Sequence, residues 1–230
     1  MNFISVTGKN WILNKFNHSD ISFLKDNFFL DEIIAKLLLI RKIRRDEIKD
    51  FLNPSIKNVL PNPENILDME KSTLRTIKSI NQNDVVGIFG DYDVDGASST
   101  ALMGRYLKDL KIKYQIYIPD REKEGFGPSI KGFKSLIDQG AKLIFTVDCG
   151  TLSFEAISYA KNNNIDVIVL DHHQAETKLP EAYSIINPNR LDDKSNLQYL
   201  CAAGVTFMFL ISMNKGLRNS NWFKKNFIKE

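Results

Sequence analysis

The sequence has little of several features that would assign it to a class at once. Its 230 residues include only 2 cysteines, Cys149 and Cys201, with no CxxC or CxxH spacing, so a structural zinc site is disfavoured and we expect two reduced thiols in a core. No apolar run reaches the roughly 18 residues that span a bilayer, and the N-terminus lacks the apolar stretch of a secretory signal. We therefore expect a cytoplasmic protein without a membrane partner.

The chain also lacks a strong charge of one sign. Its formal net charge is +3, which is too small to indicate a nucleic-acid partner through bulk electrostatics. Two local basic clusters are present, RKIRR at 41–45 and FKKNFIK at 223–229, and solvated helix faces are the favoured interpretation of both. Only local motifs can therefore indicate a function.

Hydrophobic periodicity divides the chain into a helical first part and an α/β second part. Apolar residues recur at helical spacing from about residue 23, a proline-rich connector follows at 54–63, and a further helix is expected over 68–81. Short β-branched or aromatic runs then alternate with helical stretches; they occupy 85–90, 114–118, 142–147, 167–170 and 183–187. This alternation predicts an α/β fold, with a parallel, Rossmann-like sheet of about five strands and helices on both faces.

Polar side chains directly follow three of the predicted strands. These are Asp91, Asp93 and Asp95 after the first strand, Asp148 after the third, and Asp171, His172 and His173 after the fourth. Alone, each group is explained equally well by a solvated turn, a capped strand end or a helix start. However, the carboxyl ends of parallel strands meet at one sheet edge, where α/β sheets bind ligands. Their coincidence there favours a functional site.

So many acids in one cleft repel one another unless a cation neutralises them. Mixed carboxylate and imidazole ligands suit manganese, magnesium or iron. More carboxylates than one ion can use indicate two ions with a shared acid, about 3.5 to 4 Å apart. Because such a pair activates water and stabilises the charge that develops at phosphorus, we expect phosphoester hydrolysis.

Four motifs carry a resemblance to a known family. GDYDVDGASSTALM, FTVDCGT, VIVLDHHQ and SIINPNR resemble, in order and spacing, those of the DHH phosphoesterase superfamily. The flanks FLNPSIKNVLPNP, IPDREKEGFG and LCAAGVTFMFL resemble, within it, the RecJ family of single-strand-specific DNA exonucleases. This resemblance, over roughly 38–210, implies two divalent ions, Mn²⁺ or Mg²⁺, and 5′-to-3′ hydrolysis of single-stranded DNA in repair and recombination. We accordingly expect a helical N-terminal segment at 1–82, a DHH catalytic domain at 83–215 and a basic tail at 216–230.

The resemblance also implies roles for individual residues. The expected metal ligands are Asp91, Asp93, Asp148 and His172. Catalysis is assigned to Asp148, shared between the ions, to His173, which would contact the scissile phosphate or position the metal centre, and to Asp171, which would orient a histidine.

Further residues are expected to surround this centre. Asp95 would support the ligands or stabilise the turn before the helix, and Asn187 would support them in a loop that it shapes with Asn189. Arg121 would grip phosphate, whereas Phe126 would pack against a base or in the core, and core packing is favoured. Three nearby lysines either extend a basic track or are solvated: Lys123, Lys131 and Lys134.

The sequence departs from the family pattern after its last motif. RecJ-like enzymes carry a fourth acidic motif, a closing domain and an OB-type domain, but residues 217–230 contain no aspartate, and Asp192 and Asp193 lie too early to replace it. We therefore expect the catalytic domain to be incomplete at its C-terminus, as the N-terminal portion of a RecJ-type nuclease. A separate C-terminal half, or other repair or replication proteins, would be its partners. The alternatives are a catalytically inactive scaffold that binds DNA or a partner, and a small-nucleotide phosphodiesterase, against which the helical preamble argues.

Overall fold

The computed structural model describes residues 2–12 and 14–228, which form two compact units, Met1–Pro61 and Asn62–Glu230. The N-terminal unit starts with an antiparallel hairpin of β1 (Asn2–Ile4) and β2 (Asn10–Ile12). The helices α1 (His18–Phe28), α2 (Glu32–Ile40), α3 (Ile48–Leu52) and α4 (Ile56–Val59) follow. Residues of α1, α2 and α3 form a small core of their own, which contains Leu24, Leu38 and Ile48. A hairpin therefore precedes the helices that the sequence predicts.

The C-terminal unit contains the predicted parallel sheet. Its strands are β3 (Val85–Gly90), β4 (Tyr114–Tyr117), β5 (Ala141–Val147), β6 (Asp166–Leu170) and β7 (Ser184–Ile186). They pair in the order β4-β3-β5-β6-β7, and every pairing is parallel. The predicted fold class is confirmed, because each β-branched or aromatic run forms a strand within a residue or two of its expected bounds.

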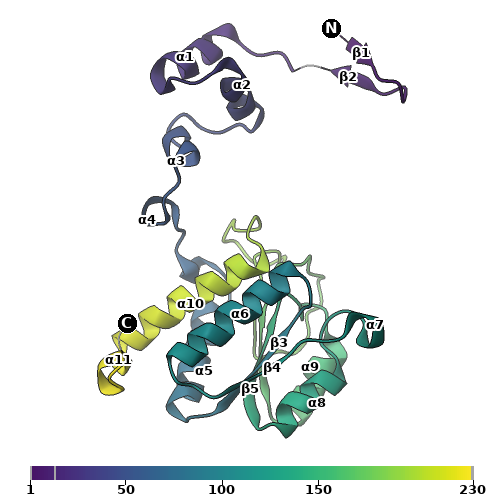
Figure 1. Cartoon of the computed structure of the whole chain (residues 1–230), viewed down its shortest axis with the longest axis vertical. Coiled ribbons are helices and arrows are strands. Elements are labelled where there is room, and N and C mark those ends of the chain that lie inside the picture. The colour runs from purple at the N-terminus through teal and green to yellow at the C-terminus, as the bar shows by residue number, and fades with distance from the viewer. Residues whose placement is uncertain (1, 13, 229–230) are drawn as a thin grey trace. The chain divides into compact units, whose positions relative to one another are not determined.

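Helices cover both faces of this sheet (Figure 1). One face carries α5 (Met69–Asn81), α6 (Val94–Asp109) and α10 (Ala202–Asn219), and the other carries α8 (Ile130–Asp138) and α9 (Phe154–Asn162). Three short helices complete the unit: η1 (Pro63–Asn65), α7 (Arg121–Glu124) and α11 (Trp222–Lys225). Successive side chains of a strand point to opposite faces, so Ile88 packs in the first layer and its neighbour Phe89 in the second.

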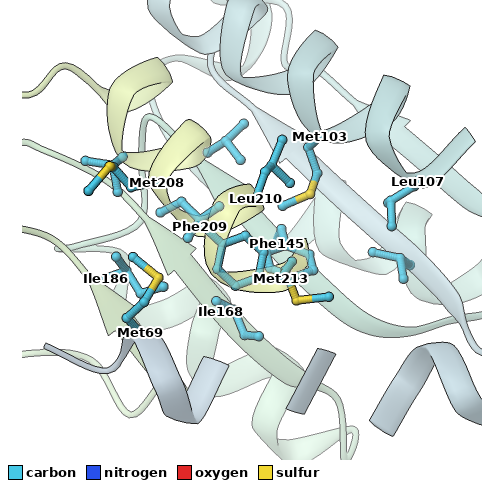
Figure 2. Packing of buried hydrophobic residues seen from close by; sticks show 14 of the residues in the cluster. Met69, Met103, Leu107, Phe145, Ile168, Ile186, Met208, Phe209, Leu210 and Met213 are labelled. Carbon is cyan, nitrogen blue, oxygen red and sulfur yellow. The ribbon is translucent and has the colours of Figure 1, made fainter. Parts of the chain in front are cut away.

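The larger core layer is shown in Figure 2. The ring of Phe145 on β5 meets that of Phe209 on α10 with centroids 5.4 Å apart, and methionines of α5, α6 and α10 fill the space around them. Each such side chain contributes about 1.5 to 3 kcal/mol when fully buried. A packed layer of this kind holds the strand ends in fixed positions, which a metal site requires.

The strand order places a switch point between β3 and β5. The chain leaves β3, forms β4 on one side of it and then crosses to form β5 on the other side. Doubly wound sheets of this order bind ligands beyond the carboxyl ends of the strands at such a point. The acids that follow β3 and β5 are therefore at the edge where a ligand is expected.

The division of the chain differs from the boundaries expected from sequence. The first unit ends at Pro61, and α5, expected within the helical segment at 1–82, contacts β5, β7 and α10 in the second unit. At the C-terminus, Trp222 and Phe223 are buried against the sheet-covering helices, so residues 216–223 belong to the packed unit. The basic character of the predicted tail comes from Arg218 and the exposed Lys224 and Lys225, and Trp222 and Phe223 anchor the tail.

The two thiols lie in different surroundings. Cys149 is buried, as expected, and burial raises the pKa of its thiol well above the usual value. The expectation of a core position for Cys201 is wrong, because this residue is the exposed N-cap of α10. No helix within the described residues is long and apolar enough to cross a membrane.

Candidate metal centre

Three aspartates directly follow the last residues of three adjacent strands, β3, β5 and β6. The backbone amide of Asp91 donates to a carbonyl of β5 at 3.3 Å, that of Asp148 to β6 at 2.9 Å, and that of Asp171 to β7 at 3.1 Å. Each acid thus extends the hydrogen-bond ladder by one step toward the next strand. Because the three strands are held in register, the acids lie at one sheet edge, as the sequence predicts.

The loop after β3 turns tightly into α6. Asp93 is the N-cap of that helix, and its Oδ1 accepts the amide hydrogens of Asp95 and Gly96, both at 3.0 Å. The Gly96 hydrogen bond is the main reason that the pKa of Asp93 is lowered. A Cβ at Gly96 would lie only 2.5 Å from the carbonyl oxygen of Asp91, so the close approach of helix and loop requires glycine here.

This close approach predicts the effect of two matched substitutions in α6. Gly96→Ala is expected to destabilise the chain by about 1 to 3 kcal/mol, because the new methyl group meets backbone atoms that cannot move aside. Gly104→Ala in the same helix, whose nearest neighbour would lie 3.4 Å away, is expected to be neutral or slightly stabilising. Urea denaturation measures both, and equal effects of the two substitutions would contradict the contact.

Two groups of side chains are positioned to hold a metal ion, and they share one residue. Asp91, Asp93 and Asp148 form the first group, while Asp148, His172 and His173 form the second. Within each group the potential ligand atoms all lie within 4.8 Å of one another. Two sites with one carboxylate in common are what a pair of ions with a bridging acid requires.

Asp148 is the most constrained of these residues. Its side chain is 2% exposed, and its Oδ1 has no hydrogen-bond partner among the described residues, although His172 Nε2 lies 3.4 Å away. Its backbone φ of 62° is uncommon outside glycine. A buried carboxylate oxygen without a donor is costly, and a bound cation is the partner that removes this cost. The residues present therefore fit a metal ion.

Burial raises the pKa of Asp148 to about 8. A hydrogen bond shared with Asp93 and repulsion from Asp95 act in the same direction, whereas the charge of His173 opposes them. Without a cation, Asp148 therefore keeps its proton up to about pH 8. A divalent ion would replace that proton.

Asp171 forms hydrogen bonds with both histidines that follow it in the chain. Its Oδ1 accepts the backbone amides of His172 at 2.7 Å and His173 at 3.2 Å and lies 2.7 Å from His173 Nδ1, while its Oδ2 accepts the Thr151 amide at 3.0 Å. Burial alone would raise the pKa of Asp171, but the bonds from His173 and Thr151 outweigh it and lower the pKa to about 2. The hydrogen bond between Asp171 and His173 is also the main reason that the pKa of His173 rises to about 9.

Replacement of Asp171 by asparagine is expected to change the titration of His173. The native imidazole should lose its proton near pH 9, and in Asp171→Asn this pKa should fall toward the ordinary value of about 6.5, because the anionic partner is gone. NMR titration of the His173 Cε1 proton measures this. Asp192→Asn is the matched control because Asp192 lies in another ion pair, with Arg190 at 2.8 Å. An unshifted His173 in Asp171→Asn would contradict the assignment.

Two asparagines fix the histidine loop. The buried Asn187 donates from Nδ2 to Thr151 Oγ1 at 2.8 Å and to the His173 carbonyl at 2.9 Å, and its Oδ1 accepts the Asn189 amide. The side chain of Asn189 in turn donates to the carbonyl of His172. Both asparagines thus contact the backbone of the histidines, as expected of residues that support a loop near the ligands.

Asp95 connects the first acidic loop to α10. Its two carboxylate oxygens accept the amides of Ala202 at 2.6 Å and Ala203 at 2.8 Å, the first two residues of a helix whose own cap residue makes no side-chain cap. Asp95 Oδ2 also lies 3.6 Å from His172 Nε2, the same ring nitrogen that lies 3.4 Å from Asp148 Oδ1. The sequence offered two roles for Asp95, support of the ligands or stabilisation of its own turn, and neither included this contact between residues 107 positions apart.

Arg121 and Phe126 lie beside the loop after β3. The Arg121 guanidinium carbon is 5.4 Å from the ring centroid of Tyr92 and 5.6 Å from that of Phe126. Phe126 is 75% exposed, so the favoured expectation of core packing is wrong. The reason is local, because the flanking Gly125 and Gly127 both have positive φ, 78° and 75°, and turn the chain out at this position.

Other charged residues near the site are engaged elsewhere. Lys123, Lys131 and Lys134 each pair with an acid, Asp120 at 3.0 Å, Glu124 at 3.4 Å and Asp138 at 2.5 Å. Asp193 accepts the amide of Leu67 at 2.8 Å, and Asp192 pairs with Arg190. The Asp193 contact holds the loop after β7 to the segment before α5, whereas the Asp192 pair lies within that loop. Both aspartates are thus engaged away from the candidate metal groups.

Comparison with known sequences finds a family model and several relatives that this chain resembles. The model of the DHH family, N-terminal domain, matches residues 85–228. The single-stranded-DNA-specific exonuclease RecJ of Bacillus subtilis (strain 168) is 30% identical over 197 residues, 86% of this chain and 25% of the relative. That of Escherichia coli (strain K12) is 33% identical over 195 residues, 84% of this chain and 33% of the relative. The chain thus spans about a quarter to a third of the length of these relatives.

Solved structures agree with this comparison. A crystal structure of exonuclease RecJ bound to manganese aligns with a TM-score of 0.60 and 26% identity, covering 66% of this chain and 38% of that chain. RecJ from Thermus thermophilus in complex with Mn²⁺ aligns with a TM-score of 0.71 and 23% identity, covering 89% of this chain and 28% of that chain, and shows the shared fold.

Proposed function

Because the chain belongs to the DHH family, we propose that its strand ends hold two divalent ions, Mn²⁺ or Mg²⁺, and hydrolyse phosphodiester bonds of single-stranded DNA. The observation that carries this proposal is that both candidate metal groups contain Asp148, whose buried Oδ1 has no hydrogen-bond partner within the described chain. The relatives are named as single-stranded-DNA-specific exonucleases, which supports the choice of substrate. Hydrolysis from the 5′ end and a role in DNA repair and recombination belong to the same proposal.

The ligands divide between two ions. Asp91, Asp93 and Asp148 would hold one ion, and Asp148 with His172 would hold the other, with Asp95 close enough to His172 to contribute. Carboxylates with one imidazole suit manganese and magnesium better than a thiophilic metal. The ions would supply an activated water and polarise the phosphate.

The chain itself would contribute positive charge for the scissile phosphate. His173 is held by Asp171 through Nδ1, which keeps the imidazole protonated up to about pH 9. Its side chain is more than half exposed, and within the described residues its Nε2 has no hydrogen-bond partner, so this nitrogen can donate to phosphate. Within the described residues, no carboxylate lies in ion-pair distance of Arg121, so its guanidinium is available to a second phosphate oxygen. Charge-assisted bonds of this kind are strongest where charge develops in the transition state.

The test is incubation of the purified chain with a labelled single-stranded oligonucleotide and Mn²⁺, with a duplex of the same sequence alongside. The proposal expects mononucleotide products from the single strand, no products in EDTA, and little cleavage of the duplex. No cleavage while the chain still binds Mn²⁺ would contradict hydrolysis and favour a scaffold with the DHH fold. Cleavage of cyclic or short dinucleotides alone would favour a small-nucleotide phosphodiesterase.

A further inference from the structure

Thr151 is a buried residue of the turn after β5, and the proposed function gives it no role. It is 1% exposed. Its backbone amide donates to Asp171 Oδ2 at 3.0 Å, and its Oγ1 lies 2.8 Å from Asn187 Nδ2. Asp171 directly follows β6 and Asn187 directly follows β7, so Thr151 joins the ends of three neighbouring strands. Its hydroxyl therefore lies between the histidine motif and the loop that supports this motif.

The direction of the hydrogen bonds through the Thr151 hydroxyl is fixed by its neighbours. Asn187 Oδ1 accepts the backbone amide of Asn189, and Asn187 Nδ2 donates to the backbone carbonyl of His173, so the Asn187 amide has only one possible orientation. Nδ2 therefore donates to Thr151 Oγ1, and the hydroxyl hydrogen is left for a second acceptor. Asp171 is that acceptor. Burial would raise the pKa of Asp171, and hydrogen bonds from the side chains of His173 and Thr151 lower it.

Donors thus hold both oxygens of the Asp171 carboxylate. Oδ1 accepts the backbone amides of His172 and His173 and lies 2.7 Å from His173 Nδ1, whereas Oδ2 accepts the Thr151 amide. A carboxylate that is held at both oxygens does not turn about its Cβ–Cγ bond, so the imidazole bonded to Oδ1 keeps one direction. The side chain of Asp171 is 2% exposed, so bulk water does not replace a lost donor.

We propose that Thr151 is a positioning residue: its hydroxyl, through Asp171, directs the His173 imidazole toward the scissile phosphate. This role rests on the proposed function, in which His173 donates to that phosphate. Valine has the shape of threonine but neither donates nor accepts, so Thr151→Val leaves Asn187 Nδ2 without this acceptor and the Asp171 carboxylate with one donor fewer. Both partners of the hydroxyl lie outside the two candidate metal groups, so the affinity for Mn²⁺ should not depend on it.

The first test is steady-state cleavage of a single-stranded oligonucleotide by the full chain with Mn²⁺. Thr151→Val should lower kcat about 10- to 100-fold, the range typical of a lost partner of a functional side chain. KM, and the Mn²⁺ affinity measured by calorimetry, should stay native. Thr151→Ser keeps the hydroxyl and should restore kcat. A residue that only stabilised the fold would not give a loss in kcat alone at native metal affinity.

The second test needs neither metal nor cleavage. Because a carboxylate only accepts, His173 Nδ1 carries the proton that it shares with Asp171 Oδ1. Proton NMR of the full chain in EDTA should show this proton as a separate downfield signal, assigned by its absence in His173→Gln. Thr151→Val should broaden or remove the signal, because a carboxylate that turns freely lets the proton exchange with solvent. Thr151→Ser should retain it.

The matched control is Thr206→Val in α10. Thr206 is buried, and its Oγ1 has no hydrogen-bond partner among the described residues, so the same change there should leave kcat and the His173 signal native. Native kcat in Thr151→Val, or a loss of kcat with an unchanged His173 signal, would overturn the proposal. If the native chain binds Mn²⁺ but does not cleave, the proposed nuclease function fails, and the NMR comparison alone decides whether Thr151 holds the imidazole.

Discussion

Asp148→Asn is expected to remove metal-dependent cleavage almost completely. The substitution keeps the size of the side chain but removes the one carboxylate that both candidate metal groups contain. The loss of kcat/KM should exceed the roughly 10- to 100-fold that is typical of a changed partner of a metal ligand, because here a ligand itself is lost. Steady-state cleavage of a single-stranded oligonucleotide with Mn²⁺ measures this effect.

The control for this variant is again Asp192→Asn, since it removes a carboxylate of the same type that is bound to Arg190. It should cleave at the native rate. Asp148→Asn with more than a tenth of native activity would show that the two groups do not depend on a shared acid.

The same residue should make the metal-free chain less stable as the pH rises. Asp148 has a pKa of about 8 in the folded chain, against an ordinary value of 3.8. Between these values the folded chain holds a proton that the unfolded chain has lost, so this contribution is fully present below about pH 4 and is lost as pH rises through 8. The slope amounts to at most about 1.4 kcal/mol per pH unit.

Denaturant unfolding of native protein and Asp148→Asn in EDTA, at several pH values, isolates this contribution as a difference between the two. Asp148→Asn should be the more stable protein at pH 8, although it is inactive, and the two should converge toward pH 4. With excess Mn²⁺ the order should reverse, because binding stabilises only a chain that holds the ion. A difference that does not vary with pH would contradict the raised pKa of Asp148.

Much of the fold and the centre of the site follow from local sequence. Each buried strand is a short apolar run, and in a parallel sheet such runs end at one edge, so Asp91, Asp148 and Asp171 could be placed together before any coordinates. The prediction succeeded because alternating strands and helices leave only a few possible arrangements. Residues that directly follow a strand inherit its position.

What could not be predicted depends on contacts between distant segments. Asp95 reaches the start of α10, and α5 joins the sheet instead of the preceding helices, because packing rather than local pattern decides both. The expectation for Phe126 failed for a local reason. An aromatic residue is a core residue by default, and the two flanking glycines were the local signal that it turns outward.

An anomalous-scattering map from crystals of the chain grown with Mn²⁺ would locate the ions directly. Two peaks are expected about 3.5 to 4 Å apart at the ends of β3, β5 and β6, with the Asp148 carboxylate between them. A single peak that Asp148 does not contact, or manganese bound only elsewhere, would contradict a hydrolytic site in which the shared acid joins two ions.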